Sequence, residues 1–154
     1  MYFILSIFIY YLYILSEYIF HYLGHIRHKY NVIYLLHITH HKKYYPINNF
    51  ESEKYRSNNE GVVDYVPLYI LLIGILYHIF EYRYWIFIII QSTLHTYINN
   101  YIHQNIHLKN SWLTRYEWFR KAKRLHYKHH QNWDKNYSFG IDHTIDKINK
   151  TYKS

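Results

Sequence analysis

Ten histidines of this chain fall into two matched sets, and their spacing is typical of metal ligands. In each set a His-x3-His pair precedes a His-x2-His-His motif. The candidate ligands are His21, His25, His37, His40 and His41 in the first set and His103, His107, His126, His129 and His130 in the second. Imidazole nitrogen binds iron, zinc, copper and nickel. One such motif would be weak evidence, but two matched sets predict a centre that holds two metal ions.

The rest of the composition excludes several kinds of metal site. The chain has no cysteine, so thiolate zinc sites, iron–sulfur clusters and disulfides are excluded, and any metal must be held by nitrogen or oxygen. Ten donors shared by two ions leave room for oxygen or water, which a closed structural zinc site would not. The alternative is that the histidines only pack together. Clustered imidazoles without a metal repel one another as they become protonated, which disfavours that alternative.

The histidine spacing also places a demand on the helices. Positions i, i+3 and i+4 of a helix share a face, so His37, His40 and His41 should converge, as should their counterparts in the second set. One unbroken helix over residues 21–41 would turn its two histidine groups toward roughly opposite faces. The metal site therefore requires a break, for which we expect Asn31 to be the position.

Seven further residues are candidates for supporting the metal ligands or lining a substrate channel. A ligating imidazole usually donates its second N–H to a carboxylate or carbonyl. The candidates are Glu17, His28, His95, Asn105, Asp142, His143 and Asp146. Each of them also has an ordinary alternative role as a helix cap, a hydrogen-bonded polar residue or a solvated side chain.

Apolar blocks predict an all-α integral membrane protein, taken as one domain over residues 1–154. Residues 1–20 are nearly long enough to cross a hydrocarbon core of about 30 Å. Residues 62–100 form two shorter apolar blocks and predict a helical hairpin, which either crosses the membrane or only enters it. Residues 21–41 and 103–146 carry the histidines and would form a helical cap at the membrane surface.

The basic residues select one orientation for this arrangement. The net charge is +8, and all the lysines and arginines except Arg83 fall on the histidine-bearing side of the predicted topology. Positive charge favours the cytoplasmic side, so we expect the cap to be cytoplasmic. Residues 112–130 predict a basic amphipathic helix at the membrane surface, capped by Asn110 or Ser111. We do not expect nucleic-acid binding, because no recognised module is visible.

The chain resembles the fatty acid hydroxylase/sterol desaturase superfamily over roughly residues 17–152. The resemblance rests on the order and spacing of several segments. They are His21-Tyr-Leu-Gly-His25, His37-Ile-Thr-His40-His41 with Pro46 after it, Tyr101-Ile-His103-Gln-Asn-Ile-His107, His126-Tyr-Lys-His129-His130, Asn136-Tyr-Ser-Phe-Gly140-Ile and Asp146-Lys-Ile-Asn-Lys-Thr151-Tyr152.

The resemblance implies a non-haem membrane oxidoreductase with two iron ions, for which zinc can substitute in purified protein. Such enzymes use O2 to hydroxylate or desaturate an unactivated C–H bond of a lipid, such as a fatty acyl chain or a sterol. An external donor, often a cytochrome b-type haem protein with its reductase, supplies the electrons. The resemblance implies a multi-pass protein, in the endoplasmic reticulum if the source is eukaryotic.

Two other functions compete with this hypothesis. One is a catalytically idle membrane protein whose metals only hold the fold, and the other is a basic adaptor that works at the membrane surface through residues 112–130. The two differ in their dependence on the histidines, because only an adaptor would keep its function after loss of His37, His40 and His41.

Overall fold

The computed structural model describes residues 1–56, 66–138 and 142–154, and within these ranges it contains helices and no strand, which confirms the all-α class. The α-helices are α1 (Tyr2–His25), α2 (Val32–Thr39), α4 (Val66–Ile79), α5 (Tyr82–Ile106), α6 (Glu117–Gln131) and α7 (Thr144–Ile148). Three short elements join them: the π-helix η1 (His40–Tyr44) and the 3-10 helices η2 (Ile47–Asn49) and η3 (Trp112–Arg115). The start of the predicted hairpin, residues 62–65, and Gly140 lie outside the described residues.

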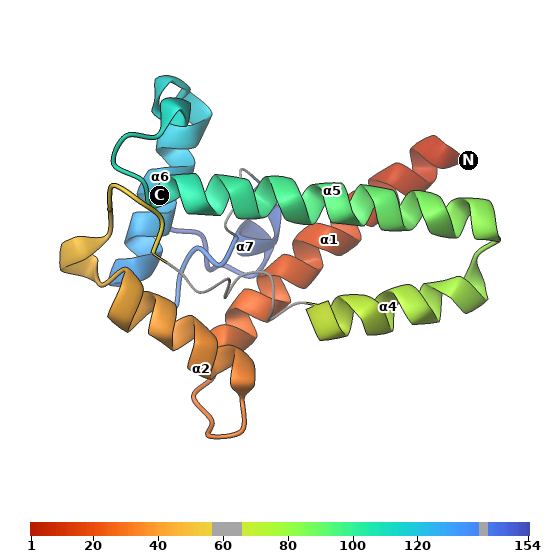
Figure 1. The fold of residues 1–154 in the computed structure, drawn as a ribbon, viewed down its shortest axis with the longest axis horizontal. Coiled ribbons are helices and arrows are strands. Elements are labelled where there is room, and N and C mark those ends of the chain that lie inside the picture. The colour runs from red at the N-terminus through yellow and green to blue at the C-terminus, as the bar shows by residue number, and fades with distance from the viewer. Residues whose placement is uncertain (57–65, 139–141) are drawn as a thin grey trace.

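Helices α1, α4 and α5 pack together at the end of the molecule that is distant from the histidines (Figure 1). Leu5 and Ile9 of α1 are buried against Leu76 of α4 and against Tyr84 and Ile88 of α5. In the described part of the region predicted as a membrane hairpin, α4 and α5 lie antiparallel and are joined near Phe80. Helix α5 continues to Ile106, so one helix carries both an arm of the hairpin and His103, and His107 follows directly as its C-terminal cap residue.

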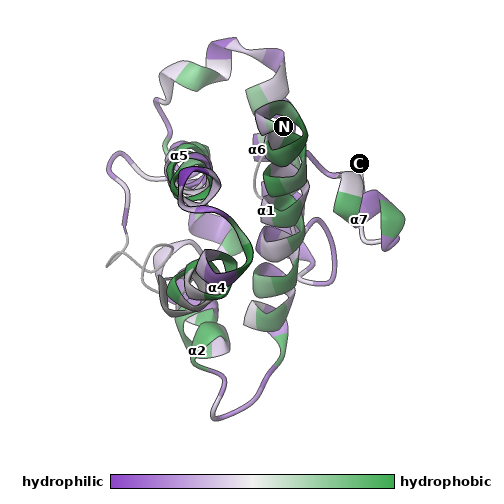
Figure 2. Cartoon of the chain, turned by 90° about the vertical axis from the view of Figure 1, so that its right-hand side faces the viewer, coloured by the Kyte–Doolittle hydropathy of each residue, from purple (hydrophilic) through white to green (hydrophobic). Residues whose placement is uncertain are grey.

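Within the described part of the chain, α1 alone is long and apolar enough to cross a membrane. Many of its large apolar side chains are exposed, and Figure 2 shows hydrophobic colour along much of the helix. By contrast, α4 has 14 residues, and α5 becomes polar toward its C-terminal end. In the described residues α1 is therefore a candidate membrane span by length and composition.

The predicted break between the first two histidine groups is confirmed. Helix α1 ends at His25 and α2 begins after Asn31, whose side-chain oxygen accepts a hydrogen bond from Tyr34 N at 3.2 Å. The Asn31 amide also donates to the carbonyl oxygens of Leu23, at 2.8 Å, and Ile26, at 3.0 Å. One side chain thus ends α1, starts α2 and holds the two helices in a tight turn.

The predicted helix over residues 112–130 is wrong in its first part. Ser111 does act as a cap, but it caps the 3-10 helix η3 by accepting a hydrogen bond from Leu113 N. Tyr116 then adopts an extended backbone, and α6 begins only at Glu117. The interruption lets Leu113 and Phe119 turn into one apolar core, which Ile106 and Phe50 complete. Tertiary packing therefore decides where this helix starts.

Candidate metal centre

Nine of the ten candidate ligands gather in two compact groups. The first histidine group contains His21, His25, His37, His41 and His129, and the second contains His40, His103, His107 and His126. Within each group, one ring nitrogen from every member lies within 4.8 Å of those of all the others. All nine are buried except His25 and His37, which are partly exposed. Each group joins residues from both halves of the sequence.

Each His-x2-His-His motif is divided between the two groups. His37 and His41 belong to the first group, whereas His40, between them in sequence, belongs to the second. The expectation that all three converge on one point was therefore wrong. Residues in a helix are separated by about 100°, so positions i+3 and i+4 lie on either side of i and can reach different centres. The second motif divides in the same way, since His129 joins the first group and His126 the second.

The Nε2 atoms of the first group face one another around a common point. His37 Nε2 lies 2.9 Å from His25 Nε2 and 2.8 Å from His41 Nε2. His129 Nε2 lies 3.1 Å from His25 Nε2 and 3.3 Å from His41 Nε2. Four imidazoles from four helical elements, α1, α2, η1 and α6, thus place one nitrogen each in the same small volume.

The second group has the same arrangement around His107. The Nε2 of His107 lies 3.1 Å from that of His40 and 3.2 Å from that of His126. His130, the tenth candidate, lies beside both groups. Its Nε2 is 3.1 Å from His126 Nε2, and its ring centroid is 4.1 Å from that of His41.

Backbone carbonyl groups fix the orientation of several of these rings. The Nδ1 atoms of His129, His107 and His130 lie 2.6, 2.9 and 2.8 Å from carbonyl oxygens. The carbonyls belong to Lys135, Phe50 and Tyr45, respectively, and His21 Nδ1 contacts the carbonyl of Tyr137 in the same way. A carbonyl oxygen only accepts hydrogen bonds, so Nδ1 carries the proton and the neutral ring presents a lone pair at Nε2.

These lone pairs test whether the residues fit a metal ion. His107 and His130 both present Nε2 lone pairs toward His126, and His129 presents its own toward His25 and His41. Converging lone pairs repel unless a cation lies among them. Two ligands about 2.1 Å from one ion and at right angles to each other would lie about 3 Å apart, close to the separations found here. The donors fit one ion in each group.

The ionisation state of the imidazole rings is the one that metal binding requires. Burial, together with neighbouring histidines, holds the pKa of His37, His40 and His41 well below the usual value of 6.5. The pKa of His129 is lowered to about 4, mainly by burial. The imidazoles are therefore neutral at physiological pH, which is the form that binds metals.

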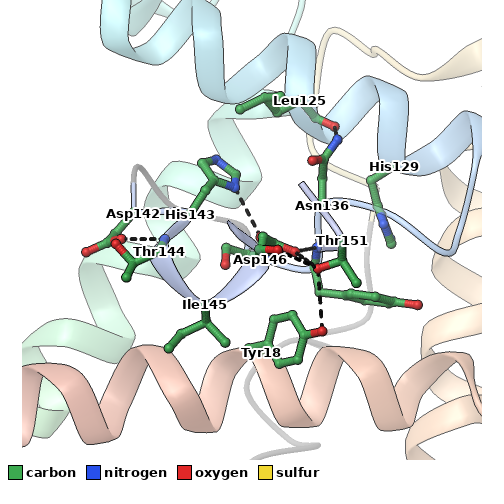
Figure 3. A network of polar contacts seen from close by, with 12 residues as sticks. Tyr18, Leu125, His129, Asn136, Asp142, His143, Thr144, Ile145, Asp146 and Thr151 are labelled. Carbon is green, nitrogen blue, oxygen red and sulfur yellow. Dashed lines mark hydrogen bonds and ion pairs between the residues drawn. The ribbon is translucent and has the colours of Figure 1, made fainter. Parts of the chain in front are cut away.

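Asp146, near the C-terminus, forms hydrogen bonds to the loop that contacts the first histidine group (Figure 3). Asp146 is fully buried and accepts hydrogen bonds from the backbone N–H groups of Tyr137, at 2.8 Å, and Ser138, at 2.9 Å. Thr151 Oγ1 donates to it at 2.8 Å. Tyr137 in turn offers its carbonyl to His21, so Asp146 contacts a candidate ligand through the backbone. A supporting role for Asp146 at a metal centre stays a prediction.

Asn136 fixes the same loop to α6. Its backbone has a positive φ of 54°, which asparagine tolerates better than most residues. The side chain is fully buried and donates to the carbonyl oxygens of Leu125, at 3.3 Å, and Lys153, at 3.0 Å. Asn136 thereby ties the loop that supplies carbonyls to the histidines to both α6 and the C-terminal segment.

The other candidates from the sequence lie outside both groups. His28 is exposed and its Nδ1 accepts a hydrogen bond from Tyr30 N. His143 is buried with its Nδ1 3.2 Å from Asp146 Oδ2, so it supports the carboxylate rather than joining the ligands. Asn105 is bonded to the carbonyl of Tyr101 and to the hydroxyl of Ser111. Glu17, His95 and Asp142 line a separate cavity between α1 and α5.

Sequence reasoning missed the residues that hold the rings in place. Tyr45 is fully buried and stacks on His107 with ring centroids 3.9 Å apart, and its carbonyl accepts from His130. Phe50 contacts His107 as well, with its carbonyl and with its ring. Every residue has a backbone carbonyl, so the residue type does not show which carbonyls support the rings. An aromatic residue shortly after a histidine motif was the one available signal.

Comparison with known proteins agrees with this geometry. The family model described as Fatty acid hydroxylase matches residues 6–151, which is nearly the whole chain. The comparison with curated proteins and the comparison with solved structures both give no match. The family match spans both His-x2-His-His motifs, both His-x3-His pairs and the supporting Asp146. The chain therefore belongs to the fatty acid hydroxylase family.

Proposed function

We propose that this protein is an O2-dependent lipid hydroxylase or desaturase that uses two iron ions held by the ten histidines. The observation that carries the proposal is the convergence of imidazole lone pairs in two adjacent, buried groups. Family membership supports a hydroxylase-type activity on a lipid. The two groups are bridged in space by His130, whose ring lies near His41 of the first group and His126 of the second.

Two irons, when bound, would share the electrons that reduction of O2 requires. The protein chain itself holds the ligand rings in place and excludes water from the site. Carbonyl groups of Tyr45, Phe50, Lys135 and Tyr137 fix the ligand rings, and burial keeps bulk water from the site. The position at which the substrate is held then decides which C–H bond of a long chain reacts, because an unactivated C–H bond is neither acidic nor basic enough to be selected by proton transfer.

The membrane arrangement belongs to the same proposal. Helix α1 would insert in the bilayer, with the α4–α5 hairpin beside it, making the protein multi-pass. The histidine groups would face the cytoplasm, in a eukaryotic cell at the endoplasmic reticulum, because the basic residues gather on that side. Electrons would come from a separate donor, such as a cytochrome b-type protein and its reductase.

The proposal is tested by metal content and lipid products measured on the same preparations. We expect about two irons per chain in detergent-purified protein expressed with added iron, since neutral imidazoles hold such ions. His40→Ala combined with His129→Ala removes one ligand from each group and should abolish both iron retention and O2-dependent lipid products. His28→Ala is the matched control, because His28 is exposed and belongs to neither group.

Each outcome separates the proposal from its competitors. Bound zinc in place of iron would support the site, and reconstitution with iron would then test the activity. Full iron occupancy with an electron donor present but no change in host lipids would favour an idle metal-binding protein. Absence of any bound metal would overturn the proposal and leave the basic surface of α6 as the working part.

A further inference from the structure

A basic hollow of about 880 Å³ lies between η2 and α6, outside both histidine groups. The cationic side chains that line it are Lys109, Arg120, Lys123, Arg124 and Lys128. Within the described residues, Glu51 supplies the only carboxylate of the lining. Figure 1 shows α6 at the opposite end of the molecule from the turn between α4 and α5. The basic hollow therefore lies away from the apolar cluster that α1, α4 and α5 form.

Three of these cations form a row of like charges along α6. Arg120, Arg124 and Lys128 follow one another at intervals of four residues, so they share one face of the helix. The buried Ala122 and Leu125 belong to the face that packs inward. Like charges four residues apart destabilise a helix, because their side chains are neighbours on its surface. An anion bound along the row would replace this repulsion by attraction.

Two of the lining cations are held in place by backbone carbonyl groups. Nη1 of Arg120 donates to the carbonyl oxygens of Thr114, at 2.9 Å, and Arg115, at 3.0 Å. Nζ of Lys123 donates to the carbonyl oxygen of Leu108 at 2.8 Å. Fixed charges lose little conformational freedom when a ligand binds, which favours binding. Arg120 and Lys123 therefore give the basic hollow a preformed positive wall.

Arg124 and Lys128 remain available to a ligand. Within the described residues, no oxygen atom accepts a hydrogen bond from either side chain, and both are at least partly exposed. The carboxylate of Glu51 lies 3.1 Å from Nζ of Lys123, so it neutralises that cation. A guanidinium binds two phosphate oxygens with parallel N–H groups, and an ammonium binds phosphate as a point charge. Arg124 and Lys128 together therefore have the chemistry of a phosphate-binding pair.

Another part of the lining is apolar. Ile47, Phe50 and Tyr127 contribute to it, and the rings of Phe50 and Tyr127 pack edge to face with centroids 5.1 Å apart. Pockets for small organic molecules usually measure about 300–1,000 Å³ and combine apolar walls with a few polar groups. The basic hollow has this size and this mixture. It fits an organic phosphate, whose charged groups meet the cations while its carbon skeleton covers the apolar wall.

We propose that the basic hollow between η2 and α6 binds an organic ligand that carries more than one phosphate group. The eight residues from Arg120 to Lys128 span about 12 Å of helix, which is long enough for two phosphate groups to contact different cations. The ligand is a soluble phosphate ester or the headgroup of a phosphorylated lipid, because both present the same oxygen atoms. Binding here depends on neither the metal ions nor the proposed reaction.

The test compares fructose 1,6-bisphosphate with fructose 6-phosphate, which share a skeleton and differ by one phosphate group. Their binding to the metal-loaded full chain in detergent is measured by isothermal titration calorimetry at neutral pH. We expect the bisphosphate to bind at least about tenfold more tightly, the effect of one additional hydrogen bond between charged groups. Added salt should weaken the binding, because it screens exposed charges. Equal binding of the two probes, or no saturable binding of either, would overturn the proposal.

Substitutions on α6 separate a specific site from the general positive charge of the protein. Arg124→Gln should lower the affinity for the bisphosphate about tenfold, because it removes a guanidinium that contacts phosphate. Lys121→Gln is the matched control, since Lys121 is exposed on the same helix and does not line the basic hollow. We expect a change of about twofold or less in this control. Equal losses in the two variants, or tighter binding of a polyglutamate peptide than of the bisphosphate, would contradict a phosphate site.

Glu51→Gln provides a gain of binding that misfolding cannot imitate. It removes the carboxylate from the lining and frees Lys123, with which that carboxylate is paired. We expect the affinity for the bisphosphate to increase by about threefold or more, because an anion no longer meets a like charge. Glu81→Gln is the control, since Glu81 is exposed at the turn between α4 and α5. Unchanged or weaker binding in Glu51→Gln would count against the assigned position of the ligand.

Reconstitution in lipid nanodiscs identifies the source of the phosphate. In phosphatidylcholine nanodiscs we expect the soluble bisphosphate to bind as it does in detergent. Nanodiscs that also contain phosphatidylinositol bisphosphate should block this binding if a lipid headgroup is the ligand, and Arg124→Gln should then weaken the block. Unimpeded binding in the same nanodiscs would support a soluble phosphate ester. Loss of the soluble bisphosphate's binding in phosphatidylcholine nanodiscs would overturn the proposal, because the site must remain open in a bilayer.

Discussion

Gly24 of α1 and His37 of α2 are in direct contact, and the contact leaves no room for a side chain at position 24. A Cβ atom there would stand 3.0 Å from Cγ and 3.1 Å from both Cβ and Cδ2 of His37. Separations this short require the neighbour to move. His37 has little freedom to do so, since its Nε2 is close to those of His25 and His41. The glycine thus permits the close approach of α1 and α2 that forms the first histidine group.

Gly24→Ala should therefore weaken metal binding while leaving the helices formed. Displacing His37 by a few tenths of an ångström misplaces one ligand, and we expect metal affinity at the first group to fall by about 10–100-fold, as for other losses of ligand positioning. Metal titration of the purified variant, with circular dichroism for helix content, measures the effect.

Gly74→Ala is the matched control for that substitution. It lies within α4 and a Cβ there would meet nothing within 4 Å. Alanine favours a helix over glycine by about 1 kcal/mol, so the control should bind metal normally and gain slightly in stability. Equal metal affinity in both variants would show that the Gly24 contact does not position His37.

The division of each histidine motif between two groups predicts separable metal sites. His37→Ala with His41→Ala removes two members of the first group, and His40→Ala with His107→Ala removes two members of the second. Each double variant should keep about one metal ion per chain, because the other group retains its donors. Elemental analysis with matched metal loading measures this. Loss of both ions in each double variant would show instead that the groups form one interdependent site.

The sequence could predict which histidines gather and the turn between the first two helices, because both depend on local patterns. Histidine spacing identified the candidates, and the opposed faces of an unbroken helix required the break that Asn31 provides. The division of His37 and His40 between groups was not predictable, since it depends on where α5 and α6 lie. The supporting carbonyl of Tyr137 was equally hidden, because every residue has a carbonyl.

The start of α6 illustrates the same limit. Asn110 or Ser111 was expected to cap this helix, but Ser111 caps the 3-10 helix η3, and an extended Tyr116 precedes α6. Leu113 and Phe119 share one core only because of that interruption. Periodicity read along one segment could not predict it, since the core that the segment joins also includes Ile106 and Phe50, which are distant in sequence.

Asn31 offers a second test of how the turn positions the ligands. Asn31→Asp keeps an oxygen that can accept from Tyr34 N but loses the amide that donates to Leu23 and Ile26. Asn31→Ala loses both. We expect Asn31→Ala to lower the free energy of unfolding by about 1–2 kcal/mol and Asn31→Asp by less, because the cap survives. Denaturant unfolding in detergent measures both. Equal losses would show that the two donated hydrogen bonds, and not the cap, stabilise the turn.

Asp146 predicts a pH dependence of stability with a defined sign. Burial raises the pKa of this carboxyl. Hydrogen bonds from His143, Ser138 and Thr151 outweigh that effect and lower the pKa to about 2. Because the unfolded chain has a pKa of about 3.9, the ionised form stabilises the fold fully above that pH, and the stabilisation is lost as the pH falls toward 2. Asp146→Asn should cost about 2 kcal/mol of unfolding free energy at neutral pH.

The difference between the wild-type protein and Asp146→Asn should then shrink as the pH is lowered from about 4 to about 2, where the wild-type carboxyl becomes neutral as well. Unfolding measured across that range on protein stripped of metal avoids loss of ligands as a second cause. Asp134→Asn is the control, because Asp134 is exposed. A constant difference across the range would mean that the ionised form of Asp146 is not what stabilises the loop at Tyr137.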